Sequence, residues 1–235
     1  MPDVVYGTHP VREALRGRRE VLAVYCTRRA GQQLEWLPDS TAVVTSERLA
    51  ELAGSDDHQG VAAEVSPYPY ADAAALLGVD RPLLVALDEV TDPHNLGAVA
   101  RVCEGAGADG LLITRRRSAA VTAAVCRASA GAVEHLQIAQ VENLADTLLG
   151  ARRPGLWTYA ADADDGERAL AYDAHDYRDG TMFVLGAEGR GLRPRVRQSC
   201  DAVATIPMRG HVESLNVSTA SAVLLFEAVR QRRGG

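Results

Sequence analysis

The alternation of short apolar runs with segments of helical periodicity is the feature that most constrains the fold of this chain. Residues 83–87 form a continuous apolar run, which is typical of a parallel strand buried on both faces. The pattern predicts further strands at 110–114, 135–139, 156–160, 181–185 and 202–206, and helices at 96–105, 119–127, 144–149 and 217–232. This rhythm indicates an α/β fold with a mostly parallel sheet that is covered on both faces.

A smaller α/β unit precedes this region. We expect Pro10 at the first position of one helix and Ser46 at the N-cap of another. Strands are expected at 20–27, 42–44 and 61–65. Residues 66–70 contain two prolines and indicate a linker, after which a short helix is expected at 71–77. We therefore predict an N-terminal domain at 1–66, a linker at 67–80 and a main domain at 81–235.

Charge and composition exclude some classes of protein. The formal net charge of −6 argues mildly against nucleic-acid binding, but all 25 basic residues are arginine, and several of them cluster. Local arginine patches can bind RNA phosphates even on an acidic protein. The cysteines form no CxxC pair and the histidines have no metal-ligand spacing, so no metal site is expected. No apolar run reaches the ~18 residues of a membrane span, and no signal region is seen, which predicts a cytoplasmic protein without a membrane partner.

The loop that follows residues 83–87 lies at the carboxyl end of a parallel strand, where α/β sheets usually bind ligands. It ends at Asn95, which can either cap a helix beginning at Leu96 or face a ligand. Arg101 follows on that helix among apolar residues, where its side chain can simply extend to solvent. This loop alone is a weak signal of function.

A glycine-rich loop, residues 186–192, follows the strand expected at 181–185. Its three glycines allow the backbone to approach a ligand closely. It has neither the spacing of a dinucleotide-binding fingerprint nor the lysine and hydroxyl residue of a Walker loop. Glu188 between the glycines suits a polar, cationic or amine-bearing ligand; a tight turn with a solvated carboxylate is the alternative.

A third segment, residues 206–218, leads into the last expected helix. Ser214, Asn216 and Ser218 stand at the mouth of a helix that is apolar on more than one face. A helix of this kind is normally buried, and a dimer interface would cover the apolar surface that one subunit leaves exposed.

Together these three segments resemble the motifs of one family, the SpoU (TrmH-like) branch of the SPOUT RNA 2′-O-ribose methyltransferases. Residues 95–101 (NLGAVAR) resemble the first motif. Residues 185–191 (LGAEGRG) resemble the second, with Ala187 where serine is frequent. Residues 206–208 (IPM) with 214–218 (SLNVS) resemble the third.

The N-terminal unit is similar to the family's substrate-binding domain, which is akin to certain ribosomal proteins. The matching residues are Gly7, His9, Val11, Glu13 and 58–60 (HQG). Residues 129–136 (SAGAVEHL) resemble a segment of the family's 23S ribosomal RNA guanosine methyltransferases. The resemblance therefore covers nearly the whole chain.

The resemblance implies a deep trefoil knot in the C-terminal part of the main domain, S-adenosyl-L-methionine as the cofactor, and a homodimer in which both subunits build each site. It also implies methylation of a ribose 2′-hydroxyl in large-subunit (23S) ribosomal RNA, on a guanosine. The implied cofactor contacts are Leu185, Gly186, Ile206, Pro207, Met208 and Leu215.

The implied catalytic residues are Arg101, Asn95, Glu188, Ser214 and Asn216. A guanidinium stays protonated, so Arg101 would stabilise the developing alkoxide rather than act as a base. Asn95 and Asn216 would orient Arg101 and the ribose, and Ser214 would complete the polar wall.

Several arginines are expected to contact RNA phosphates: Arg18, Arg19, Arg28, Arg29, Arg115, Arg116 and Arg117. Three alternative functions stay open: a tRNA ribose methyltransferase, an antibiotic-resistance methyltransferase of ribosomal RNA, and a non-catalytic RNA-binding protein of ribosome assembly. A generic nucleotide-binding protein is disfavoured because a phosphate-binding loop is absent from the sequence.

Overall fold

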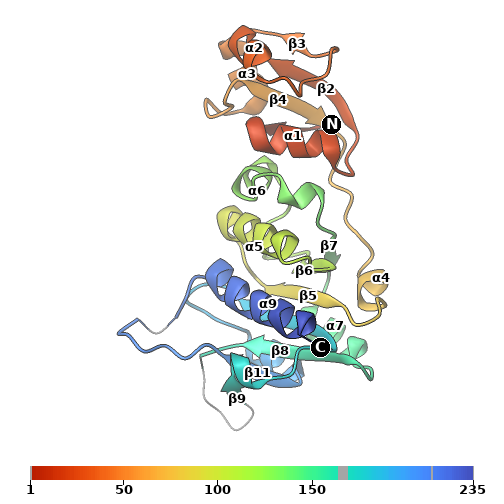
Figure 1. The fold of residues 1–235 in the computed structure, drawn as a ribbon, viewed down its shortest axis with the longest axis vertical. Coiled ribbons are helices and arrows are strands. Elements are labelled where there is room, and N and C mark those ends of the chain that lie inside the picture. Colours follow the sequence, from red (N-terminus) through yellow and green to blue (C-terminus); the bar gives the residue numbers. More distant parts are fainter. Residues whose placement is uncertain (1, 164–168, 213, 235) are drawn as a thin grey trace.

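A computed structural model describes residues 2–163, 169–212 and 214–234, which form two sheets with helices packed against them (Figure 1). The strands of the smaller sheet are β1 (Asp3–Tyr6), β2 (Val21–Cys26), β3 (Ala42–Val43) and β4 (Val61–Val65). Those of the larger sheet are β5 (Leu83–Asp88), β6 (Gly110–Thr114), β7 (Ile138–Val141), β8 (Leu156–Ala161), β9 (Ala169–Ala171), β10 (Gly180–Gly186) and β11 (Ala202–Thr205).

The helices lie between these strands along the chain. In the N-terminal part they are α1 (Thr8–Arg16), α2 (Arg28–Gln33) and α3 (Ser46–Ala53). In the remainder they are α4 (Ala73–Leu77), α5 (Pro93–Gly105), α6 (Ala123–Ala128), α7 (Leu144–Ala151), α8 (Pro194–Ser199) and α9 (Val217–Arg233), with short 3₁₀ turns η1 (Ala132–Glu134) and η2 (Tyr172–Ala174).

The larger sheet has the strand order β7-β6-β5-β10-β8-β11-β9, and all of its described strand pairs are parallel. Alternate side chains of each strand point to opposite faces. Val85 and Leu87 pack with α5, α6 and α9, whereas Leu84 and Ala86 pack with α4, α7 and α8. This arrangement confirms the predicted α/β fold with a mostly parallel sheet covered on both faces.

The register of the central strands brings several loops to one edge of the sheet. Gly186 of β10 pairs with Asp88 of β5, and Leu185 pairs with Ala161 of β8. Ala204 of β11 pairs with the same Ala161. Because these strands are parallel, the loops that leave their carboxyl ends all start at this edge, where open α/β sheets bind ligands.

The smaller sheet has the order β1-β4-β2-β3, and β2 and β3 are its parallel pair. Figure 1 shows it at one end of the molecule, with α1 facing α6 and the larger sheet. The predicted division into residues 1–66, 67–80 and 81–235 stays a prediction, as does the trefoil knot. Among the described residues, no helix is both long and apolar enough to cross a membrane.

Several helix starts differ from expectation. The helices expected at 71–77 and 119–127 begin at Ala73 and Ala123. Helix α1 begins at Thr8, so Pro10 is its third residue rather than its first. Thr45, not Ser46, caps α3, because the Thr45 side chain accepts a hydrogen bond from the amide of Arg48 at 3.2 Å. Helix α5 begins at Pro93, and Asp92 is its cap.

The segment expected to be a linker is packed rather than loose. Tyr68 is buried, and its hydroxyl donates to the carbonyl oxygens of Val133 and Leu136 at 2.9 and 3.0 Å. The hydroxyl of Tyr70 accepts a hydrogen bond from the amide of Val121 at 2.9 Å. The two tyrosines therefore attach this segment to the larger domain.

Helix α5 packs unusually closely on α6 at Gly97. A Cβ atom placed on Gly97 would lie 2.5 Å from the Cβ of Ala128 and 2.9 Å from the carbonyl oxygen of Val125. We expect Gly97→Ala to lower the free energy of unfolding by about 1–3 kcal/mol, because the helices must separate.

Gly105→Ala is the matched control, since Gly105 ends the same helix with no atom within 4 Å of an added Cβ. This variant should keep or raise stability by up to about 1 kcal/mol. Urea denaturation of both variants measures the difference, and equal midpoints would contradict the close packing of α5 on α6.

Candidate cofactor-binding and active site

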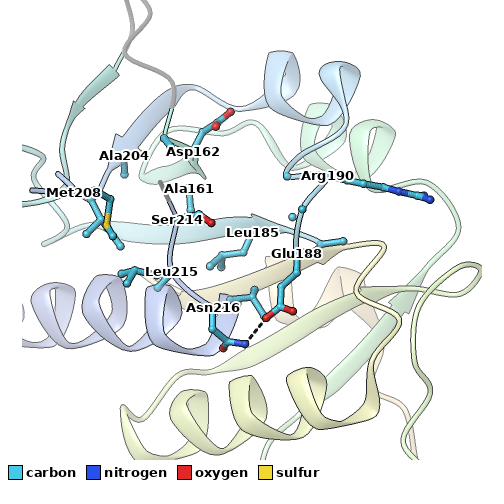
Figure 2. A pocket seen from close by; sticks show the side chains of 18 residues that line it. Ala161, Asp162, Leu185, Glu188, Arg190, Ala204, Met208, Ser214, Leu215 and Asn216 are labelled. Carbon is cyan, nitrogen blue, oxygen red and sulfur yellow. Dashed lines mark hydrogen bonds between the residues drawn. The ribbon is translucent and has the colours of Figure 1, made fainter. Parts of the chain in front are cut away.

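A cavity of about 640 Å³ opens at the carboxyl edge of the larger sheet. Its lining comes from the ends of β8, β10 and β11 and from the chain that leads into α9 (Figure 2). The predicted cofactor residues in its lining are Leu185, Gly186, Ile206, Met208 and Leu215, together with Glu188, Ser214 and Asn216 from the predicted catalytic set. Pro207 is not among the lining residues.

The glycine-rich loop after β10 forms a tight backbone turn on one side of the cavity. The amide of Gly191 donates to the carbonyl oxygen of Ala187 at 2.9 Å. Gly189 and Gly191 have φ values of 74° and 64°, which glycine adopts without strain. A Cβ atom on Gly186 would lie 2.1 Å from the carbonyl carbon of Gly191. Two backbone segments therefore meet here with no space for a side chain.

An ion pair between a buried carboxylate and a half-exposed arginine holds the base of this loop. Asp88 ends β5 with a fully buried side chain, and its carboxylate accepts hydrogen bonds from the backbone amide and the guanidinium of Arg193 at 2.6–3.2 Å. Arg193 also contacts Glu89 at 3.1 Å. The hydrogen bonds to Asp88 raise the pKa of the Arg193 guanidinium above its usual value. Arg193 follows the glycine-rich loop directly, so the pair attaches that loop to the end of β5.

Sequence reasoning missed the pair of Asp88 and Arg193. The available signal was a carboxylate at the end of an otherwise apolar strand, where a charged side chain needs a partner.

Asn216 joins the three predicted motifs. It caps α9, with its side-chain oxygen accepting from the amide and hydroxyl of Ser218 at 2.9 and 2.6 Å. The Nδ2 group of Asn216 therefore points away from Ser218. It donates to Oδ1 of Asn95 at 2.9 Å and to Oε1 of Glu188. The Asn216–Glu188 contact is visible at the edge of the cavity in Figure 2. Asp92, not Asn95, caps α5, and the Asn95 side chain contributes to this polar cluster.

Arg101 lies apart from the cavity lining. It sits on α5 with an exposed side chain and is not among the residues that form the cavity wall. The structure therefore brings together four of the five predicted catalytic residues, either in the cavity wall or through Asn216.

All of the predicted RNA-binding arginines except Arg19 are exposed. Arg28 and Arg29 are exposed in the first turn of α2, and Arg18 and Arg116 are exposed as well. Arg115 and Arg117 are exposed but contact Glu142 and Glu89 at 2.7 and 3.4 Å.

Arg19 does not fit the prediction that it contacts RNA. Its side chain is only 2 % exposed, and it forms ion pairs with Asp3 and Glu134. Its donors are occupied inside the protein, so it does not offer them to a phosphate.

The residues that line the cavity suit the chemistry of S-adenosylmethionine. Leu185, Ile206, Leu215 and Val217 provide apolar walls for a flat ring, and the turn at Gly186 exposes backbone close to it. The carboxylate of Glu188 is placed for a cationic group. Among residues 2–163, 169–212 and 214–234, no cluster of three or more potential metal ligands is present.

The fold and the site together define a class of protein. It comprises α/β proteins that have a parallel sheet and a cofactor-sized cavity between three loops. Residues 82–226 match the model of the SpoU rRNA methylase family, and residues 4–71 match that of the RNA 2′-O ribose methyltransferase substrate-binding domain.

Individual relatives agree with these matches. The chain is 41 % identical to the 23S rRNA (guanosine-2′-O-)-methyltransferase RlmB of Ralstonia nicotianae, over 97 % of this chain and 96 % of the relative. It is 36 % identical to a tRNA/rRNA methyltransferase of Synechocystis, over 98 % of this chain, and spans 63 % of that relative's length. The crystal structure of the SpoU methyltransferase AviRb from Streptomyces viridochromogenes, in complex with S-adenosylmethionine, matches with a TM-score of 0.81 and 26 % identity, over 99 % of this chain and 91 % of AviRb.

This chain belongs to the SpoU family of RNA methyltransferases. S-Adenosylmethionine is the methyl donor of the family, which confirms the predicted cofactor.

Gly186→Ala tests the assignment of the cavity to the cofactor. The added methyl group would displace the turn at Gly191, so we expect the Kd for S-adenosylmethionine to rise about tenfold or more. Isothermal titration calorimetry measures this change.

Gly210→Ala is the control, because a Cβ atom at Gly210 meets no atom within 4 Å. Its affinity should equal that of the unmodified protein. Unchanged affinity in Gly186→Ala would show that the cofactor binds elsewhere.

Proposed function

We propose that this protein transfers a methyl group from S-adenosylmethionine to a ribose 2′-hydroxyl of 23S ribosomal RNA, on a guanosine. The observation that carries the proposal is the hydrogen-bonded cluster of Asn95, Glu188 and Asn216 at the rim of a cavity with apolar walls. The identity to the Ralstonia protein over almost its whole length supports ribosomal RNA and guanosine in particular. This substrate is also the basis for the predicted cytoplasmic location.

The cavity walls would bind and orient the donor. Leu185, Ile206 and Leu215 would hold its adenine ring, and the turn at Gly186 would let the backbone contact it closely. S-Adenosylmethionine supplies a methyl group on a positively charged sulfur, so the donor is already activated. The protein must therefore position the ribose oxygen in line with that carbon and assist loss of its proton.

The polar cluster would perform that task. Asn216 holds Asn95 and Glu188 in fixed positions, so the ribose meets a preorganised rim. The donor would supply the methyl group, with the electron pair of its carbon–sulfur bond left on sulfur, while this cluster held the ribose oxygen in place. The 2′-hydroxyl proton would pass to the Glu188 carboxylate or to solvent. Arg101 would stabilise the negative charge that develops on the ribose oxygen.

A homodimer is part of the proposal. Arg101 is exposed on α5, away from the cavity lining of its own chain. Phe226 is 50 % exposed on α9, which packs on α5. A second copy that covered these helices would bury Phe226 and surround Arg101 with protein, where its charge would act more strongly.

The decisive experiment is methyl transfer from tritiated S-adenosylmethionine to unmodified 23S ribosomal RNA and, in parallel, to unmodified bulk tRNA. We expect label in the ribosomal RNA, in linkages that resist alkali, because a 2′-O-methyl group blocks alkaline cleavage. Label in tRNA alone would keep the chemistry and overturn the substrate. Absence of label in both RNAs, with cofactor bound, would favour a non-catalytic role in ribosome assembly.

Arg101→Ala tests the catalytic assignment in the same assay. We expect kcat to fall by about 10²–10³ with the Kd for S-adenosylmethionine unchanged, because charge stabilisation of the transition state is lost. Glu51→Ala, at an exposed position of α3 and so outside the helices that the second copy would cover, is the control and should keep full activity. Full activity in Arg101→Ala would refute the role given to Arg101.

A further inference from the structure

Residues 131–136 form a docking segment that contacts the N-terminal domain through Gly131, Glu134, His135 and Leu136. We propose that it fixes the orientation of that domain, and that Arg19 and Glu134 act as positioning residues that determine which ribose reaches the active site. This inference rests on the proposed function for the identity of the substrate. The fixed orientation itself can be tested without RNA.

The central contact is a buried ion pair between the two parts of the chain. Arg19 lies in the turn between α1 and β2, and its Nη1 donates to Oε1 of Glu134 at 3.2 Å. Its remaining donors bind Oδ2 of Asp3 at 3.0 Å and the carbonyl oxygen of Ser66 at 3.1–3.2 Å. The side chains of Arg19 and Glu134 are 2 % and 0 % exposed.

The backbone also packs closely at the interface between the N-terminal domain and the docking segment. A Cβ atom on Gly17 would lie 2.6 Å from the Cβ of Glu134, and one on Gly131 would lie 2.6 Å from the Cβ of Glu13. Gly131 also has a φ of 87°, a conformation that favours glycine. A loose contact between domains would not require glycine on both surfaces.

Further polar contacts surround this centre. His135 contacts the Glu13 carboxylate at 2.9 Å, and the guanidinium of Arg18 donates to the carbonyl oxygen of Leu136. Tyr68 donates to the carbonyl oxygens of Val133 and Leu136 while its ring lies 5.7 Å from the Arg19 guanidinium. Each of these bonds has a defined direction, so together they select one orientation of the domain.

A buried ion pair is weak evidence for net stability, because desolvation offsets its attraction. In this protein the pair of Arg19 and Glu134 would instead specify the geometry of the interface. Burial raises the pKa of the Glu134 carboxyl, and the nearby Arg19 opposes that rise. Removal of one partner leaves the other buried and uncompensated. The expected consequence is a domain that can reorient.

The docking segment is also connected to the catalytic helix. It follows α6 directly, and α6 is the helix against which Gly97 of α5 packs with no space for a side chain. Helix α5 carries Asn95 and Arg101. Figure 1 shows α1, α6 and α5 in succession between the smaller sheet and α9. The N-terminal domain, which would grip the RNA, is therefore held at a set distance from the residues that act on the ribose.

Glu134→Gln is the test variant, because it keeps the side-chain shape and removes the charge. Glu51→Gln is the control, since Glu51 is exposed and pairs with Arg48 within α3. In Glu134→Gln we expect the Kd for S-adenosylmethionine to stay within twofold of the unmodified protein. The KM for 23S ribosomal RNA should rise at least tenfold, and mapped 2′-O-methyl groups should spread to neighbouring riboses. A single methylated ribose with unchanged KM would overturn the proposal.

A distance measurement keeps the inference separate from the function. Spin labels at Glu51→Cys and Leu149→Cys, exposed positions on α3 and α7, report the separation of the two parts by double electron–electron resonance. The four native cysteines are buried and should escape labelling. We expect a single narrow distribution of distances between the two labels in the protein that keeps Glu134. In the Glu134→Gln variant we expect a broad distribution. A broad distribution with Glu134 present would overturn the fixed orientation, even if no RNA were methylated.

Discussion

The parallel register of β5, β10, β8 and β11 is the constraint on which the site depends. It places the carboxyl ends of four strands at one edge, so loops that are far apart in the chain leave the sheet together. The ion pair of Asp88 and Arg193 then attaches the glycine-rich loop to the neighbouring strand. Asn216 completes the arrangement, because the cap of α9 uses its oxygen and leaves its amide nitrogen for Asn95 and Glu188.

Much of this could be predicted from the sequence, because strands at the centre of the larger sheet, such as residues 83–87 and 181–185, are largely apolar runs whose length matches a buried strand. The strand at Gly110–Thr114 is found as predicted. The strand predicted at 135–139 begins at Ile138 instead, because residues 135–137 form a turn and bend that connect the 3₁₀ turn η1 to the strand. The sequence also indicated that the three motif loops act together, and the cavity they line agrees with that interpretation.

What could not be predicted depends on partners distant in the chain. Arg19 looked like a surface arginine in a cluster, and only the approach of Glu134, over a hundred residues away, makes it an interior side chain. Asn95 was expected either to cap its helix or to face a ligand, and side-chain geometry shows that Asp92 is the cap instead. Short strands such as β1 and β9 carry too few residues for a pattern of their own and exist because a neighbouring strand pairs with them.

The shared amide of Asn216 has an evolutionary consequence. One side chain serves three segments at once: its oxygen ends a helix, and its two N–H groups bind a neutral amide and a carboxylate. An aspartate at this position would keep the cap but face Glu188 with a like charge, and a serine would be too short to reach both partners. Positions 95, 188 and 216 can therefore change only in concert, so in a set of relatives their substitutions should appear as correlated triplets rather than one by one.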